Sequence, residues 1–221
     1  MNRLALLHTV PALVERFRNL LQTELAGLDN FHMVDESLLQ DLMRHGPSPG
    51  ITRRVVALAT LAADAGADFI LFTCSSTSPA IDVARQCLTV PIMKIDDPMA
   101  ERAVELGRRI GVLCTTNSTV EPSASLGRSH AQRLARQVEV MPALVAGAYP
   151  ALQAGDRQGH DALVTAAAEE LAKSCDVIIL AQASMAHLEQ PLGKQLGRPV
   201  LSSPPLIIEA LRQAKKAAEH H

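Results

Sequence analysis

Short apolar runs alternate with amphipathic stretches along the whole chain. Several of the apolar runs are continuous, which is typical of parallel strands covered on both faces. We predict eight strands: Leu4–His8, Phe31–Asp35, Phe69–Thr73, Pro91–Ile95, Ile110–Thr115, Val138–Ala143, Val177–Gln182 and Val200–Ser202. Because helical patterns lie between them, the chain predicts βα units with right-handed crossovers around mostly parallel sheets.

Two helices have clear end signals. Apolar residues between Val10 and Leu25 recur at helical spacing, and Thr9 is placed to cap this first helix. Pro11 suits its first turn. A further helix is predicted from about Thr52 to Ala65, ending at Gly66 as a C-terminal cap.

Two segments of the chain, 67–76 and 175–184, resemble each other. Each has a small residue, an aspartate, four apolar residues and then a turn containing small polar residues. This repeat, at about half the chain length, predicts two similar α/β lobes. The alternative is that buried parallel strands resemble one another without any repeat.

Composition narrows the class of protein. The 221 residues are enough for one large domain or two lobes, and 48% are hydrophobic. With 2% aromatic residues and a scattered net charge of −2, nucleic acid is not an expected partner. No apolar run approaches the roughly 20 residues that cross a bilayer, and the N-terminus is too short for a signal peptide. We therefore expect a cytoplasmic protein without membrane partners.

The motifs of common cofactors do not occur. The four cysteines show no CxxC spacing and the histidines form no metal-binding pair, so no metal site is expected. No glycine-rich nucleotide loop occurs either, and no cofactor is expected. The terminal segment 219–221 is either native or a tag remnant and carries no argument.

Small polar residues follow four predicted strands. Ligands bind at the carboxyl ends of the strands in open α/β sheets, which makes these turns the candidate site. The turns are His8-Thr9, Thr73-Cys74-Ser75-Ser76-Thr77-Ser78, Thr115-Thr116-Asn117-Ser118-Thr119 and Gln182-Ala183-Ser184-Met185.

Cys74 is the strongest candidate for chemistry. A thiol between a strand and a helix start lies at the positive end of the helix dipole, which predicts a lowered pKa and a reactive thiolate. The amides and hydroxyls of Ser75, Ser76 and Thr77 form a predicted pocket for a carboxylate or an oxyanion. The alternative is a helix-capping turn with an incidental cysteine.

Other side chains have weaker cases. Cys114 either takes part in the site or points into the core, whereas Cys87 and Cys175 are predicted packing residues. His8 is a possible proton donor, or a structural hydrogen-bonding residue. His187 is expected to face solvent.

Together these residues resemble the aspartate/glutamate/hydantoin racemase superfamily over essentially the whole chain. The motifs that carry the resemblance are Thr73-Cys74-Ser75-Ser76-Thr77, Ile110-Gly111-Val112-Leu113-Cys114-Thr115, Asp176-Val177-Ile178-Ile179-Leu180-Ala181-Gln182 and Pro199-Val200-Leu201-Ser202-Ser203-Pro204. The resemblance implies an α/β fold with two pseudo-symmetric flavodoxin-like lobes, each a mostly parallel sheet flanked by helices, and a site between them. Residues 1–95 and about 205–221 would form the first lobe and about 96–204 the second. A cofactor-free homo-oligomer is also implied.

The resemblance also implies roles for individual residues. Family members use two thiols as acid and base, and the first corresponds to Cys74. The second position holds Gln182, which can form hydrogen bonds but cannot exchange a proton at neutral pH. The expected catalytic pair is therefore Cys74 with Gln182. The expected substrate-binding residues are His8, Ser75, Ser76, Thr77, Thr115, Thr116, Ala183 and Ser184.

The resulting functional prediction is a cofactor-independent racemase or isomerase. It would transfer a proton next to a carboxylate or carbonyl of an amino acid or related small anionic acid, with Cys74 as the catalytic thiol. Cys114 or His8 could serve as the second acid. One alternative is a single-cysteine decarboxylase or lyase of the same superfamily, and another is a small-acid-binding pseudoenzyme.

Overall fold

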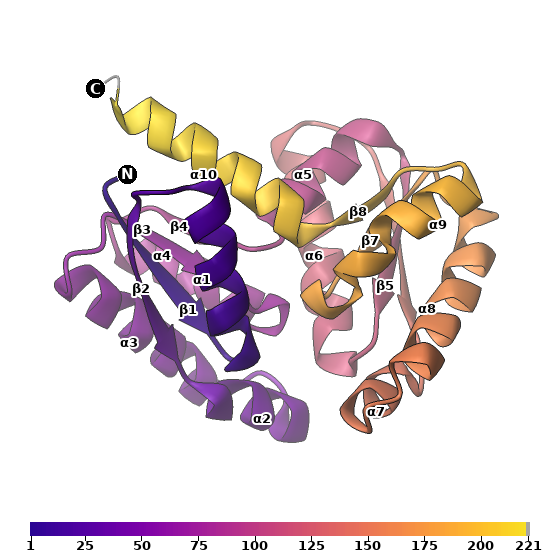
Figure 1. The fold of residues 1–221 in the computed structure, drawn as a ribbon, viewed down its shortest axis with the longest axis horizontal. Helices are drawn as coiled ribbons and strands as arrows, with labels where there is room; N and C mark the ends of the chain where they lie inside the picture. Colours follow the sequence, from indigo (N-terminus) through magenta and orange to yellow (C-terminus); the bar gives the residue numbers. More distant parts are fainter. Residues whose placement is uncertain (220–221) are drawn as a thin grey trace. The chain divides into compact units, whose positions relative to one another are not determined.

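The computed structural model describes residues 1–219, and His220 and His221 lie outside the described residues. The chain forms two compact units. The first comprises Met1–Ile95 and the segment from Ile207 onward, and the second comprises Asp96–Leu206. Each unit contains a four-stranded parallel sheet flanked by helices (Figure 1). The predicted fold class is confirmed.

The first unit has the strand order β2-β1-β3-β4. Its strands are β1 (Arg3–His8), β2 (Asp29–Val34), β3 (Phe69–Phe72) and β4 (Ile92–Lys94). Residues of α1 (Ala12–Glu24) and α10 (Ser203–Glu219) pack on one face of the sheet. The other face is covered by α2 (Glu36–His45), α3 (Pro49–Asp64) and α4 (Ser78–Cys87). A 3₁₀ turn, η1 (Ser75–Thr77), connects β3 to α4.

The second unit repeats this order as β6-β5-β7-β8. Its strands are β5 (Arg109–Cys114), β6 (Glu139–Leu144), β7 (Val177–Leu180) and β8 (Val200–Ser202). One face packs against α5 (Asp97–Leu106) and α6 (Asn117–Arg133). The other packs against α7 (Ala148–Gln153), α8 (Arg157–Ala172) and α9 (Glu189–Leu196), with η2 (Ala183–Leu188) between β7 and α9.

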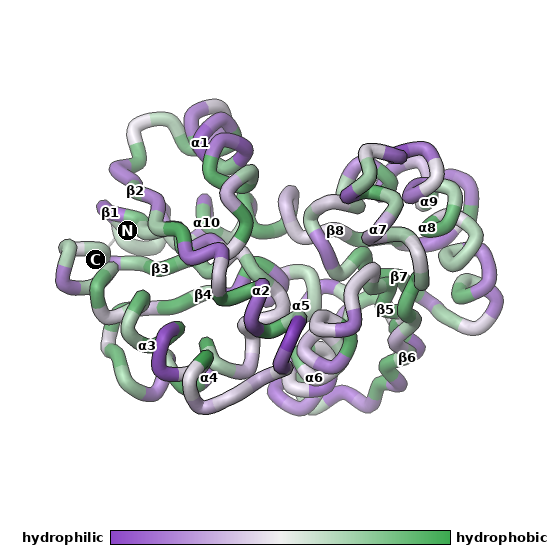
Figure 2. The backbone as a smooth tube through the Cα atoms, turned by 90° about the horizontal axis from the view of Figure 1, so that it is seen from below, coloured by the Kyte–Doolittle hydropathy of each residue, from purple (hydrophilic) through white to green (hydrophobic). Residues whose placement is uncertain are grey.

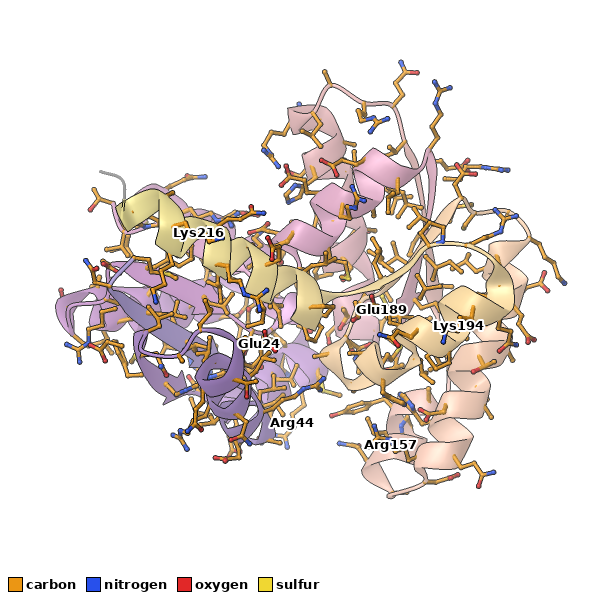
Figure 3. All side chains as sticks on the ribbon, turned by 45° about the horizontal axis from the view of Figure 1, so that its top comes forward. Glu24, Arg44, Arg157, Glu189, Lys194 and Lys216 are labelled. Carbon is orange, nitrogen blue, oxygen red and sulfur yellow. The ribbon has the colours of Figure 1, made fainter. Side chains whose placement is uncertain are left out.

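All eight predicted strands are present, each within two residues of the predicted ends. The strands β3, β5 and β7 are strongly hydrophobic, and the hydrophilic segments lie mainly on helices and connections (Figure 2). Charged side chains such as Glu24 and Lys216 lie on exposed helix positions (Figure 3). Among residues 1–219, no helix has both the length and the apolar character needed to cross a bilayer.

The start of α1 differs from its prediction, and the end of α3 agrees with its prediction. Helix α1 begins at Ala12, and Pro11 occupies the N-cap position without a side-chain cap, so the predicted cap at Thr9 is wrong. Thr9 is instead buried next to the thiol of Cys74. Helix α3 does end before Gly66, whose φ of +86° is accessible to glycine at little cost.

The sequence repeat has a structural counterpart in two aspartates. Asp68 accepts hydrogen bonds from the amides of Asn2 and Arg3, at 2.7 and 3.0 Å. Asp176 accepts from the amides of Arg108 and Arg109, at 3.0 and 2.9 Å. Each carboxylate thus holds the first strand of its sheet against the strand that follows the aspartate.

We expect Asp68→Ala and Asp176→Ala each to lower the melting temperature at pH 7 by about 2–4 °C. At Asp68 desolvation raises the carboxyl pKa, but the hydrogen bonds from the two amides and the nearby N-terminal charge together outweigh it; at Asp176 the two amide hydrogen bonds are the main influence and lower the pKa. Their contribution to stability is therefore present above the unfolded-state pKa of about 3.9 and is lost as pH falls through the lower folded-state value. Calorimetry between pH 2 and 7 should show the deficits of the variants shrinking in acid. The control is Asp64→Ala, at an exposed position of α3; an equal loss in that variant would contradict the assignment.

Candidate functional site

The first cluster of candidate residues lies at the carboxyl ends of β1 and β3. The Thr73 amide donates to the Leu7 carbonyl at 3.0 Å, so the two strand ends stay side by side. Cys74 follows with an extended backbone and directly precedes η1. The structure thus places His8, Thr9, Cys74 and η1 at one edge of one sheet.

Cys74 is a half-buried free thiol. Desolvation by the surrounding protein raises its pKa. The Thr9 hydroxyl, the amides of Ser76 and Thr77 and the Thr77 hydroxyl act in the opposite direction, but their combined effect is smaller. The predicted lowering of this pKa is therefore wrong, because burial outweighs the local hydrogen-bond donors.

Two residues of η1, Ser76 and Thr77, interact with Cys74. The Thr77 hydroxyl donates to the Cys74 carbonyl at 2.8 Å, and the amides of Ser76 and Thr77 favour the thiolate. Ser76 and Thr77 are buried and Ser75 is half-buried. Thr9 was not among the expected site residues. Its hydroxyl is buried and lies near enough to the Cys74 sulfur to lower the pKa of the thiol, but the geometry falls short of a hydrogen bond.

His8 is held by both of its ring nitrogens. Its Nδ1 lies 2.8 Å from the Thr73 hydroxyl, and its Nε2 lies 2.9 Å from Nδ1 of His32 on β2. Burial and the neighbouring His32 lower the pKa of His8 to about 4, so it is neutral at pH 7. This arrangement fits the structural alternative for His8. Strand β1 pairs with β2 so that His32 lies opposite Leu6, which puts it on the same face of the sheet as His8 and makes the two histidines diagonal neighbours.

The second cluster lies at the carboxyl ends of β5 and β7. Gln182 Oε1 accepts hydrogen bonds from the Thr115 amide at 2.5 Å and the Thr115 hydroxyl at 2.9 Å. Gln182 Nε2 donates to the Thr116 hydroxyl at 3.4 Å. Because a backbone amide can only donate, the carboxamide orientation is fixed, and Nε2 is the group that can donate to a ligand. Ala183 and Ser184 follow in η2, both half-buried.

The remaining cysteines occupy different environments. Cys114 is buried among the apolar residues beneath α5 and α6, and burial together with Asp96 raises its pKa to about 12. It therefore cannot exchange protons readily at neutral pH. Cys175 is buried in the core, as predicted, whereas Cys87 is exposed, so its predicted packing role is wrong.

Comparison with known proteins identifies the family. A family model for Asp/Glu/Hydantoin racemase matches residues 5–211, so the chain belongs to this family. No curated protein sequence matches it significantly.

The fold is shared with solved racemases. Allantoin racemase from Klebsiella pneumoniae is 16% identical, with a TM-score of 0.68 over 99% of this chain and 89% of that one. Glutamate racemase RacE1 from Bacillus anthracis is 16% identical, with a TM-score of 0.71 over 98% and 82%. Aspartate racemase from Picrophilus torridus is 12% identical, with a TM-score of 0.69 over 97% and 94%. At these identities the similarity establishes the fold.

The raised pKa of Cys74 predicts slow alkylation at neutral pH. We expect the rate with iodoacetamide to reach half its maximum at a higher pH than the rate of a short unstructured cysteine peptide measured in parallel. Thr9→Val should move this midpoint higher, because it removes a group that stabilises the thiolate. The measurement uses a Cys87→Ser background, since Cys87 is exposed. A midpoint at or below that of the peptide would contradict the prediction.

The fixed carboxamide of Gln182 predicts a contribution to stability. Gln182→Ala leaves the amide of buried Thr115 without its acceptor, which costs about 1–3 kcal/mol of unfolding free energy. Urea unfolding at equilibrium measures this loss. Ser184→Ala, two residues away in η2, is the matched control and should change stability by less than about 0.5 kcal/mol. Equal stability of Gln182→Ala and the wild type would disprove the assigned hydrogen bonds.

Proposed function

We propose that the protein is a cofactor-independent racemase or isomerase that transfers a proton next to a carboxylate or carbonyl of an amino acid or related small acid. Cys74 is its catalytic thiol. The observation that supports this most directly is the environment of Cys74. Desolvation favours the neutral thiol, while Thr9 and two amides favour the thiolate. Opposing influences of this kind suit a group that must both accept and donate a proton.

The proton transfer follows from ordinary acid–base chemistry. The Cys74 thiolate removes the hydrogen from the carbon next to the substrate carbonyl, and the electrons of the C–H bond move into an enolate. If the Cys74 thiol returns its proton to the same face, the starting enantiomer forms again, whereas a proton that a second acid gives to the opposite face of the enolate carbon inverts the centre. Partial burial of Cys74 limits competition from water.

Neutral donors would bind the substrate. In this proposal the carboxylate of the substrate is held beside Cys74 by the Ser75 hydroxyl, and the Gln182 Nε2 group with the hydroxyls of Thr116 and Ser184 forms a second set of neutral donors in the other unit. His8 supports the turn through Thr73 rather than contacting the substrate, since both of its ring nitrogens are occupied. The residues proposed to contact the substrate carry no formal positive charge, which suits a small acid bound by hydrogen bonds.

A second candidate function is a single-cysteine decarboxylase or lyase. It is favoured by Gln182, which is hydrogen-bonded to Thr115 and has no proton to exchange at neutral pH. In that reaction the bond to a carboxylate breaks and carbon dioxide leaves. The enolate that remains takes its proton from the Cys74 thiol.

Proton NMR in heavy water tests the proposal with both enantiomers of aspartate, glutamate and hydantoins, and with arylmalonates and maleate. We expect at least one panel member to exchange its α-proton for deuterium. Cys74→Ala should lose this exchange for one enantiomer, together with any inversion, because the thiol serves one face of the carbon. The Cys87→Ala variant, which removes an exposed thiol, should behave like the wild type.

The outcomes separate the candidate functions. If carbon dioxide is released from a malonate and depends on Cys74, the decarboxylase is supported instead. If Cys74→Ala exchanges both enantiomers at the wild-type rate, Cys74 is not the catalytic thiol. If the panel binds without exchange, measured as a rise in melting temperature, the protein is a small-acid-binding pseudoenzyme.

A further inference from the structure

Two histidines of the first unit form a contact that the proposed proton transfer does not use directly. His8 Nε2 lies 2.9 Å from His32 Nδ1, and His8 Nδ1 lies 2.8 Å from the Thr73 hydroxyl. The Thr73 hydroxyl in turn lies 3.2 Å from the Leu7 carbonyl. These contacts join three neighbouring strands, because His32 belongs to β2, His8 ends β1 and Thr73 directly follows β3 (Figure 1).

Another pair of neighbouring histidines has a carboxylate between its rings. In the second unit, Asp161 contacts His160 Nδ1 at 2.7 Å and His187 Nε2 at 2.8 Å, and the His187 side chain is 32% exposed. A carboxylate in that position can accept a proton from each ring. His8 and His32 contact each other directly, so their hydrogen bond needs one ring to donate and the other to accept.

One arrangement of protons satisfies all three contacts in the first unit. The Leu7 carbonyl can only accept, so the single hydroxyl proton of Thr73 points to it, and Thr73 Oγ1 accepts from His8 Nδ1. His8 Nε2 is then an acceptor and receives its hydrogen bond from His32 Nδ1. We call this series, from His32 through His8 and Thr73 to Leu7, the His32 chain.

The opposite direction of donation is unfavourable. It would turn the Thr73 hydroxyl proton toward His8 and lose the hydrogen bond to Leu7. It would also put a proton on His32 Nε2, which is buried and has no hydrogen-bond partner among residues 1–219. A buried N–H without an acceptor costs free energy, so the His32 chain runs in one direction.

Packing holds the two rings in this arrangement. Their planes differ by 14°, with centroids 5.1 Å apart, which fits an N–H of one ring directed at the nitrogen lone pair of the other. The ring of Phe17 on α1 lies against His8, with centroids 5.9 Å apart. His8 is 1% exposed, so water has little access to replace its hydrogen bonds.

The His32 chain reaches both turns that lie next to the candidate thiol. Thr73 directly precedes Cys74, and the Thr73 amide also bonds to β1 at 3.0 Å. Thr9 directly follows His8, and its hydroxyl lies near the Cys74 sulfur. The contact of His8 with Thr73 comes one residue beyond the last paired residues of β1 and β3. The chain therefore extends the contact between these strands to the residues that flank the thiol.

We infer that His32 is a positioning residue for Cys74. Through the His32 chain it holds His8 and Thr73 in place, and with them the two turns that flank the thiol. The inference rests on the proposed function for the role of Cys74, but not for the hydrogen bonds themselves. It adds a residue of β2, a strand that supplies none of the predicted site residues.

The His32 chain requires both imidazoles to be neutral. Burial, with a smaller contribution from His32, lowers the pKa of His8 to about 4, and burial also lowers the pKa of His32. Of the charged side chains on α1, Arg18 lowers the pKa of His32 and Glu15 raises it. Asp35, whose amide bonds to the His8 carbonyl, is paired with an arginine of α3. The chain is therefore intact at pH 7 and is lost as the pH falls toward 4.

The first test locates the ring protons. Long-range proton–nitrogen NMR at pH 7 reports which nitrogen of each imidazole carries the proton. We expect the proton on Nδ1 in both His8 and His32. A proton on Nε2 of either ring would overturn the inference, whatever reaction the protein catalyses.

The second test breaks the His32 chain in a Cys87→Ser background. His32→Leu removes the donor, and we expect the turns to loosen and admit water to the thiol. Because desolvation is the largest influence on the pKa of Cys74, iodoacetamide should react about 3- to 10-fold faster at pH 7, the change that half a unit to one unit of pKa produces. His32→Asn should stay close to the starting rate, since its amide nitrogen can donate from the place of Nδ1. An unchanged rate in His32→Leu, or an equal increase in both variants, would overturn the inference.

The matched control is Asp68→Ala in the same background. This change weakens the first unit at the opposite ends of β1 and β3 and leaves the His32 chain intact, so it should not alter the alkylation rate. Melting temperatures establish that each variant is folded. If Asp68→Ala accelerates alkylation as much as His32→Leu, the effect is general loosening and the inference is overturned.

Deuterium exchange connects the His32 chain to the proposed reaction. For a substrate that exchanges in the wild type, His32→Leu should lower the Cys74-dependent rate by about 10- to 100-fold, as a small misplacement of a reacting group does. His32→Asn should recover most of it. Unchanged exchange in His32→Leu would overturn the inference and leave the proposed function intact. Absence of exchange in the wild type would overturn the proposed function, while the ring protons and alkylation rates would still decide whether His32 positions the thiol.

Discussion

Burial of the sheets on both faces is the constraint on which the rest of the structure depends. Parallel strands such as β3 and β7 are enclosed by helices on either side, so their residues must be apolar and uncharged. In these two strands polar side chains are therefore confined to the ends. Because every strand in a unit points the same way, the turns after the two central strands meet at one edge. The candidate chemistry of each unit follows from this confinement.

The same burial sets the chemistry of Cys74. A thiol at a strand end is close enough to the core for desolvation to raise its pKa, and nearby donors only partly compensate. At Gln182 burial has a different consequence. An amide and a hydroxyl of Thr115 near the core need an acceptor, and the carboxamide oxygen satisfies both. One edge therefore presents a group that can exchange a proton, and the other presents a fixed hydrogen-bond donor.

The two units thus share a fold but carry different side chains at equivalent positions. The shared part includes the strand order and the aspartates Asp68 and Asp176, each of which binds two amides of a neighbouring strand. The differing part lies in the turns, where side chains vary without disturbing the sheets. A cluster around Asp161 occurs at the start of α8 in the second unit.

The sequence by itself determined the fold class, the eight strands and the candidate turns, because apolar runs and turn residues depend on local patterns. It also identified Cys74 and Gln182 as equivalent positions, since the repeat is visible in the letters. Only the tertiary structure decided the direction of the Cys74 pKa shift, the burial of Cys114 and the contact of Thr9 with the thiol. It also brought together His187 and Asp161, 26 residues apart. These features depend on desolvation and on contacts between distant segments, which a linear pattern does not contain.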